Sequence, residues 1–228
     1  MHGKVKLTRR QIKEDKFATF MLTAKSRLEE NWQYYVIGLA AVILAIVAVV
    51  YYMSSSKSTK VEAGQKYSQA LSDYRSGNNQ VALLALSKLV DDNSDEPTTR
   101  QALFMLGKIN LETKNYSEAT RYFEQFNSKY QSDKLLAAAS LAGIAACDEN
   151  QGQFAAAAAK YTEAVGFYAD GPSQGDYLMS AMRCYLLGGD MEKAKSSLSV
   201  IKDKYKGTEL ALRAERFFAE KGSYTSGS

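Results

Sequence analysis

The chain has 228 residues, 46% of them hydrophobic, and a net charge of +4, which is enough for one domain of roughly 150–175 residues beside a separate apolar segment. Its single histidine, His2, excludes most histidine-dependent catalysis, and its two cysteines, Cys147 and Cys184, are too few for a disulfide framework or a thiolate metal site. The sequence contains no phosphate loop, nucleophile elbow, zinc spacing or dinucleotide fingerprint. We therefore expect no enzymatic activity, no cofactor and no small-molecule substrate.

Charge is distributed unevenly along the chain. Residues 1–33 hold eight Lys and Arg residues against four acids, and the residues after them hold equal numbers of acids and bases. The whole net charge therefore lies near the N-terminus, and the larger part of the chain is neutral. Because phosphate binding needs a basic face, nucleic acid is not an expected partner.

Within the basic segment 1–33, residues 8–31 have the pattern of an amphipathic helix. Apolar residues recur at helical spacing, with bases on the remaining positions: Phe17, Phe20, Met21, Ala24 and Leu28. Such a helix lies in the headgroup layer with its bases near anionic lipid, or it is a solvated extension that orients membrane insertion. The sequence leaves both interpretations open.

Residues 34–53 read YYVIGLAAVILAIVAVVYYM and carry no charge. A helix of this length matches a bilayer core of about 30 Å. Aromatic residues flank it at both ends, as expected at the headgroups: Trp32, Tyr34, Tyr35, Tyr51 and Tyr52. A core helix would carry a polar side, and a signal peptide would have a short basic start and a small-residue cleavage site. We predict a permanent, single transmembrane helix.

The flanking bases predict the orientation of that helix. Lys16, Lys25 and Arg27 lie near its N-terminal end with five more bases beyond them, against three lysines on the other side. The positive-inside rule then places residues 1–33 in the cytoplasm and the larger domain outside it.

After a polar spacer at 54–62, the chain repeats. Four alanines recur at intervals of 37, 38 and 37 residues: Ala82, Ala119, Ala157 and Ala194. Four residues after each alanine comes a large apolar residue, and three residues further another apolar residue follows; in the second repeat these are Phe123 and Phe126. Pro97 and Pro172 both lie fifteen residues after their repeat's alanine, and proline cannot continue a helix, so they mark boundaries between repeats.

This pattern resembles the tetratricopeptide (TPR) repeat, in which helix A, a tight turn and helix B carry small and aromatic residues at fixed offsets. The second repeat matches best, at Leu106, Gly107, Asn115, Tyr116, Ala119 and Phe123. We predict an all-α protein: an N-terminal amphipathic helix, a single transmembrane helix, and a TPR α-solenoid of about four helix pairs with a C-terminal capping helix. The TPR-like domain spans 63–221, with repeats near 63–99, 100–137, 138–174 and 175–207, a cap at 208–221 and a flexible tail at 222–228.

Two features that suggest chemistry have simpler interpretations. Cys147 and Cys184 occupy equivalent positions in consecutive repeats, about 8–10 Å apart if their helices pack side by side. Because a disulfide needs Cα atoms within about 7 Å, buried free thiols are favoured. The acidic stretch 91–96 lacks the glycine and final glutamate of an EF-hand loop, so a solvated turn is the better interpretation than a calcium site.

Mapping the repeat onto the A helices predicts a concave face that binds an apolar segment of another protein. Its predicted residues are Tyr67, Leu71, Tyr74, Arg75, Phe104, Lys108, Leu111, Met179, Arg183 and Leu186. The alternative is that these residues pack against the capping helix or neighbouring A helices.

The order of a short basic segment, one membrane helix and four TPR repeats resembles the YfgM-type family, ancillary subunits of the bacterial Sec translocon. That resemblance implies an inner-membrane protein with a periplasmic domain, and protein partners that include the Sec channel, a membrane-anchored chaperone and secretory clients. It implies no catalytic residue. Two alternatives remain: a structural scaffold in cell-envelope assembly or division, similar to periplasmic TPR proteins of the Tol-Pal system or of outer-membrane assembly, and a mitochondrial import receptor with an N-terminal anchor.

Overall fold

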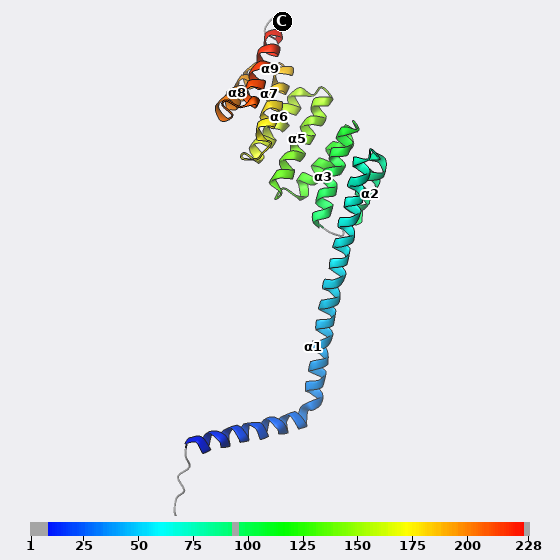
Figure 1. Cartoon of the computed structure of the whole chain (residues 1–228), viewed down its shortest axis with the longest axis vertical. Coiled ribbons are helices and arrows are strands. Elements are labelled where there is room, and N and C mark those ends of the chain that lie inside the picture. Colours follow the sequence, from blue (N-terminus) through cyan, green and yellow to red (C-terminus); the bar gives the residue numbers. More distant parts are fainter. Residues whose placement is uncertain (1–8, 93–95, 226–228) are drawn as a thin grey trace, which may run out of the picture. The chain divides into compact units, whose positions relative to one another are not determined.

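The computed structural model describes residues 9–92 and 96–225, and every regular element in these ranges is an α-helix (Figure 1). The chain divides into two compact units after Ser58. Helix α1 (Arg9–Arg75) contributes to both units, and the predicted spacer 54–62 is part of this helix.

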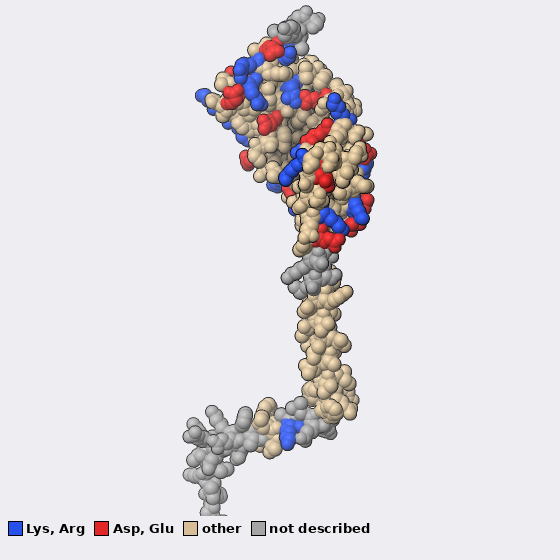
Figure 2. Space-filling view, turned by 45° about the vertical axis from the view of Figure 1, so that its right-hand side comes forward, with Lys and Arg blue, Asp and Glu red and all other residues tan. Residues whose placement is uncertain are grey.

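The first unit contains the apolar stretch of α1. Trp32–Tyr52 is 21 residues long and apolar enough to cross a membrane, and none of it is buried against the rest of the chain. Figure 2 shows no Lys, Arg, Asp or Glu along it. The core helix of a soluble protein would be mostly buried, so that interpretation does not apply here, whereas a membrane anchor and a signal sequence both match this length and composition.

The predicted amphipathic segment is helical from Arg9 onward. Phe20 and Met21, two of its expected apolar positions, are exposed. The side chains of Phe17, Ala24 and Leu28 lie outside the described residues.

The second unit consists of helix pairs stacked in chain order. Each pair has an A helix and a B helix, and the A helices are the end of α1 and then α3 (Glu96–Glu112), α5 (Lys134–Asn150) and α7 (Gln174–Leu187). The B helices are α2 (Asn79–Asp92), α4 (Tyr116–Lys129), α6 (Phe154–Phe167) and α8 (Met191–Lys204). A last helix, α9 (Glu209–Thr225), packs against α7 and α8. The predicted solenoid of four helix pairs with a cap is confirmed.

The turn between A and B helices has the same geometry in all four pairs. A residue with positive φ follows each A helix, at Gly77, Lys114, Gly152 and Gly189. In each turn, the N–H of this residue donates a hydrogen bond to the carbonyl three residues before it. The N–H of the next residue donates to the carbonyl five residues before it, as from Asn78 to the Asp73 carbonyl at 2.9 Å. This is the Schellman motif, which satisfies the last carbonyls of a helix and favours glycine at the left-handed position. The sequence places lysine there in the second repeat only.

The repeated alanines lie in the first turn of each B helix, and all four are fully buried. The apolar residues that follow them, such as Phe123 and Phe126, are also buried, except Leu198, which is half-buried. The predicted repeat phase is therefore confirmed by the core. A methyl side chain at these positions lets the helix backbones approach, and the larger residues then fill the space between successive pairs.

Phe123 in α4 joins the second and third pairs. Its ring lies between Gly107 of α3 and Gly143 of α5, where an added Cβ would come within 2.6 and 2.4 Å of ring carbons. Phe104 packs beside it with the ring centroids 5.9 Å apart. Two glycines on neighbouring A helices thus make the space that one phenylalanine fills.

Candidate functional site

The residues predicted to form a binding face all lie on A helices. The end of α1 carries Tyr67, Leu71, Tyr74 and Arg75, α3 carries Phe104, Lys108 and Leu111, and α7 carries Met179, Arg183 and Leu186. We call the surface formed by these helices the A face. The structure brings some of these side chains together on it and places others in the core.

Tyr74 and Lys108 belong to one polar cluster that connects the first two A helices. The Tyr74 hydroxyl donates a hydrogen bond of 2.6 Å to a carboxylate oxygen of Glu112. The Lys108 ammonium lies 3.9 Å from the other oxygen of Glu112 and 5.7 Å from the centre of the Tyr74 ring. The hydrogen bond to Glu112 raises the pKa of Tyr74, with burial adding to the rise. Sequence reasoning missed Glu112, although its i, i+4 spacing from Lys108 is a known signal for an ion pair.

Arg183 forms a second cluster, which connects α5 to α7. Its guanidinium makes two hydrogen bonds to the Glu149 carboxylate, at 2.6 and 2.8 Å, and the Tyr161 hydroxyl donates to the same carboxylate at 3.1 Å. Burial alone would raise the pKa of Glu149, but the hydrogen bonds and charge of Arg183 outweigh it and lower that pKa. The positive charge of Arg183 is therefore paired with a carboxylate of the same chain.

The apolar members of the predicted set mostly serve the core. Phe104 packs against Phe126, with the ring centroids 6.2 Å apart, as well as against Phe123. Met179 and Leu186 retain only 8% and 1% of their accessible surface and belong to the cluster that α9 covers. These three residues therefore pack against the capping helix or neighbouring helices, which is the alternative to a binding role.

Tyr67, Leu71 and Leu111 are half-buried, whereas Arg75 and Lys108 are exposed. The two exposed bases and Tyr74 form the accessible part of the predicted site, in the first two repeats, and the structure adds Glu112 to it. This part combines an aromatic ring, two bases and one acid, which suits contacts with a polypeptide rather than a chemical reaction.

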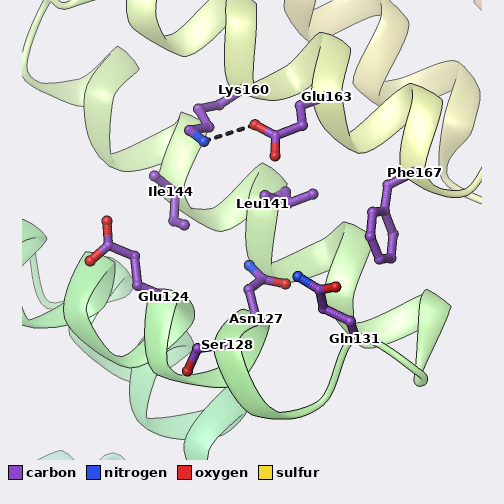
Figure 3. A pocket seen from close by; sticks show the side chains of 9 residues that line it. All are labelled: Glu124, Asn127, Ser128, Gln131, Leu141, Ile144, Lys160, Glu163 and Phe167. Carbon is purple, nitrogen blue, oxygen red and sulfur yellow. Dashed lines mark hydrogen bonds and ion pairs between the residues drawn. The ribbon is translucent and has the colours of Figure 1, made fainter.

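The B helices carry two hollows at equivalent places in the repeat. The α2/α4 hollow has a volume of about 250 Å³ over Leu106 and Asn110 of α3, and the α4/α6 hollow has about 230 Å³ over Leu141 and Ile144 of α5. Figure 3 shows the second, with amide and carboxylate groups around an apolar floor. At the corresponding place between α6 and α8, the Tyr185 hydroxyl lies 3.2 Å from the Thr162 hydroxyl.

The described residues offer no site for a metal ion, since no group of three His, Cys, Asp or Glu residues there could hold one. Both hollows are smaller than the ~300–1,000 Å³ that pockets for small molecules usually have. Cys147 and Cys184 are buried and free, and burial together with the Glu149 charge raises the pKa of Cys184 to about 12. That thiol is therefore protonated and unreactive. In the acidic stretch, residues 93–95 lie outside the described residues.

Comparisons with known proteins agree with the repeat architecture. A model of the tetratricopeptide repeat-like domain matches residues 25–170, and a tetratricopeptide repeat model matches residues 176–208. No curated protein matches the chain significantly.

Two similar solved structures are TPR-like repeats of a putative kinesin light chain from Podospora anserina, one of them a variant with a single substitution. Each is 18% identical and covers 72% of this chain, with 85% and 86% of its own length matched and TM-scores of 0.57 and 0.56. At this identity they show the fold alone. The family match spans more than half of the chain, and the protein belongs to the tetratricopeptide repeat-like domain family.

Proposed function

We propose that this protein is a non-catalytic, membrane-tethered TPR protein that binds other proteins beside the Sec translocon, on the periplasmic face of a bacterial inner membrane. One observation carries the proposal: a TPR unit shares its first helix with an uncharged, largely apolar stretch of 21 residues, none of it buried against the rest of the chain. A helix whose surface is apolar over most of its length needs an apolar solvent, and a bilayer supplies it. The family match begins at residue 25, before this stretch. This supports the interpretation that the stretch stays in the mature protein and is not a cleaved leader.

TPR repeats indicate a protein–protein interaction module, and the accessible part of the A face is the proposed binding surface. Tyr74 offers a half-buried aromatic ring, Arg75 and Lys108 offer positive charge, and the half-buried Tyr67 and Leu71 widen the apolar area. Aromatic and arginine side chains contribute most at protein interfaces. The Sec channel, a membrane-anchored chaperone and emerging secretory proteins are proposed as partners because the order of segments resembles the YfgM-type family.

The membrane part of the proposal is tested on the full chain in native membranes. Alkaline carbonate extraction should leave the protein in the pellet, and its intact mass should equal that of the uncleaved chain. Protease added to spheroplasts should degrade the TPR unit and spare residues 1–33. A shorter mature protein in the soluble fraction would show that Trp32–Tyr52 is a signal sequence and would overturn tethering.

The partner is tested by photocrosslinking in living cells. A photoreactive amino acid replaces Tyr74 or Arg75 in separate variants, and a third variant carries it at the exposed Lys88 of α2 as the control. Adducts with the Sec channel, its chaperones or secretory proteins from the A face alone would support the proposal. Adducts only with division or outer-membrane assembly proteins would favour the envelope scaffold, and no adducts would exclude the A face as the binding surface.

A further inference from the structure

The α4/α6 hollow contains a buried polar atom that the fold does not use. The side-chain nitrogen Nδ2 of Asn127, on α4, is buried and has no hydrogen-bond partner. Figure 3 shows this side chain beside Gln131, at the edge of the hollow. A buried donor left without an acceptor costs about 1–3 kcal/mol, so its presence calls for a role. An acceptor that enters the hollow would remove that cost.

The charge of the hollow is unbalanced toward the acidic side. The one base that lines it, Lys160, is held by Glu163 at 2.8 Å. Glu124, on the opposite wall, is exposed, and it lies close enough to Asp148 for its charge to change the pKa of that carboxyl group. Burial raises the pKa of Asp148, Lys160 opposes that rise, and the charge of Glu124 adds to it. A ligand with a positive charge would therefore be attracted to the Glu124 side.

The floor and the volume of the hollow indicate what else the ligand contains. Leu141 and Ile144 form an apolar floor, and the ring of Phe167 closes one end (Figure 3). A volume of about 230 Å³ is below that of most small-molecule pockets but suits one or two side chains of a longer chain. A water molecule alone would satisfy the Asn127 amide, but it would make no apolar contact with Leu141 and Ile144 and would not neutralise Glu124.

We propose that the α4/α6 hollow is a second protein-binding site, which takes an extended segment with an apolar residue and a Lys or Arg two positions apart. The apolar side chain lies on Leu141 and Ile144, and the base pairs with Glu124. The half-buried Asn127 side chain turns toward the hollow, where its amide donates a hydrogen bond to a backbone carbonyl of the segment. Residues two apart in an extended segment point to the same side, which sets the spacing. The site is on the B helices, so it does not depend on the partner proposed for the A face.

The test uses the purified full chain in mild detergent and fluorescent nine-residue peptide pools. One pool has a fixed Leu-Xaa-Lys centre, and the matched pools have Leu-Xaa-Glu or Ser-Xaa-Lys. Fluorescence anisotropy should show binding of the first pool only. Glu124→Lys should weaken that binding about tenfold and create binding of the Leu-Xaa-Glu pool. Glu192→Lys, on the exposed surface of α8, is the control and should change neither.

Asn127→Leu separates a ligand-binding amide from a structural one. If the amide serves a ligand, the variant should weaken binding of the Leu-Xaa-Lys pool while the melting temperature of the free protein rises, because an unpartnered donor is removed. Equal binding of all three pools, no effect of Glu124→Lys, or a lower melting temperature for Asn127→Leu would each overturn the proposal. Crosslinking from Tyr74 would be unaffected by any of these outcomes.

Discussion

Replacing Gly143 with alanine tests how α3, α4 and α5 pack together. Gly143 lies in the middle of α5, where an added Cβ would be 2.4 Å from Cε2 and 2.6 Å from Cζ of Phe123. Contacts this short do not occur between real atoms, so the ring must move. It cannot turn toward α3, because Gly107 already faces its other edge and the ring is 98% buried.

The change in the free energy of unfolding caused by Gly143→Ala is the sum of two opposing effects. Alanine in place of a mid-helix glycine favours the helix by up to about 1 kcal/mol. Forcing an extra methyl group into a filled core costs about 1–3 kcal/mol. We expect a net loss of about 1–2 kcal/mol, and a domain of this size loses roughly 2–4 °C of melting temperature per kcal/mol. Gly143→Ala should therefore lower the melting temperature by about 4 °C.

The assay is thermal unfolding of the full chain in mild detergent, followed by circular dichroism. Gly64→Ala is the matched control, because Gly64 is also inside a helix but has nothing within 4 Å of an added Cβ. That variant should show only the helix-propensity gain and melt at the same or a slightly higher temperature. Phe123→Leu combined with Gly143→Ala should lose less than the sum of the two single changes, because the smaller side chain removes the clash.

A rise in melting temperature for Gly143→Ala, equal to that of Gly64→Ala, would refute this account of the packing. So would strict additivity in the double variant. Either result would mean that Phe123 has room to move and that the two glycines are not required for the close approach of the helices.

Three further predictions concern the turns and the Glu149 cluster. Lys114→Gly should raise the melting temperature by a few degrees, because Lys114 has φ of 63° where the other three turns have glycine, and a side chain in that region costs about 1–2 kcal/mol. Lys88→Gly, in the regular helix α2, is the opposite control and should lower it. Arg183→Met should cost about 2 kcal/mol in urea unfolding, because it leaves the Glu149 carboxylate half-buried and without its cation, and an unchanged midpoint would contradict this. The folded-state pKa of Glu149 lies below its ordinary value of 4.5, so its contribution to stability is complete above about pH 4.5 and is lost as the pH falls through the folded pKa. Glu149→Gln should therefore flatten the loss of stability between about pH 5 and pH 3, and a parallel curve for wild type and variant would refute the assignment.

The candidate site was only partly predictable. Helical spacing placed Tyr74 and Lys108 on one face, and the structure brings them together around Glu112. The same spacing put Met179 and Leu186 on that face, yet α9 covers them. Periodicity shows which residues share a side of a helix, but whether that side meets solvent or another helix depends on elements elsewhere in the chain.

The sequence by itself determined the local features of this protein. The spacing of the alanines set the repeat, the glycines at the left-handed positions set three of the four turns, and the lack of charge defined the apolar segment 34–53. The turns and the apolar segment depend on residues within one helix pair or one helix, and the repeat is visible as a regular spacing along the chain, so none of them needs the contacts between pairs.

Only the tertiary structure decided the contacts between pairs. The pairing of Arg183 with Glu149 joins residues 34 positions apart, and the ring of Phe123 fills a space made by glycines on two other helices. The α4/α6 hollow likewise exists because side chains from α4 and α6 fail to close over Leu141 and Ile144 of α5. Such features depend on the distance and rotation between packed helices, which interdigitating side chains set collectively and no single stretch of sequence encodes.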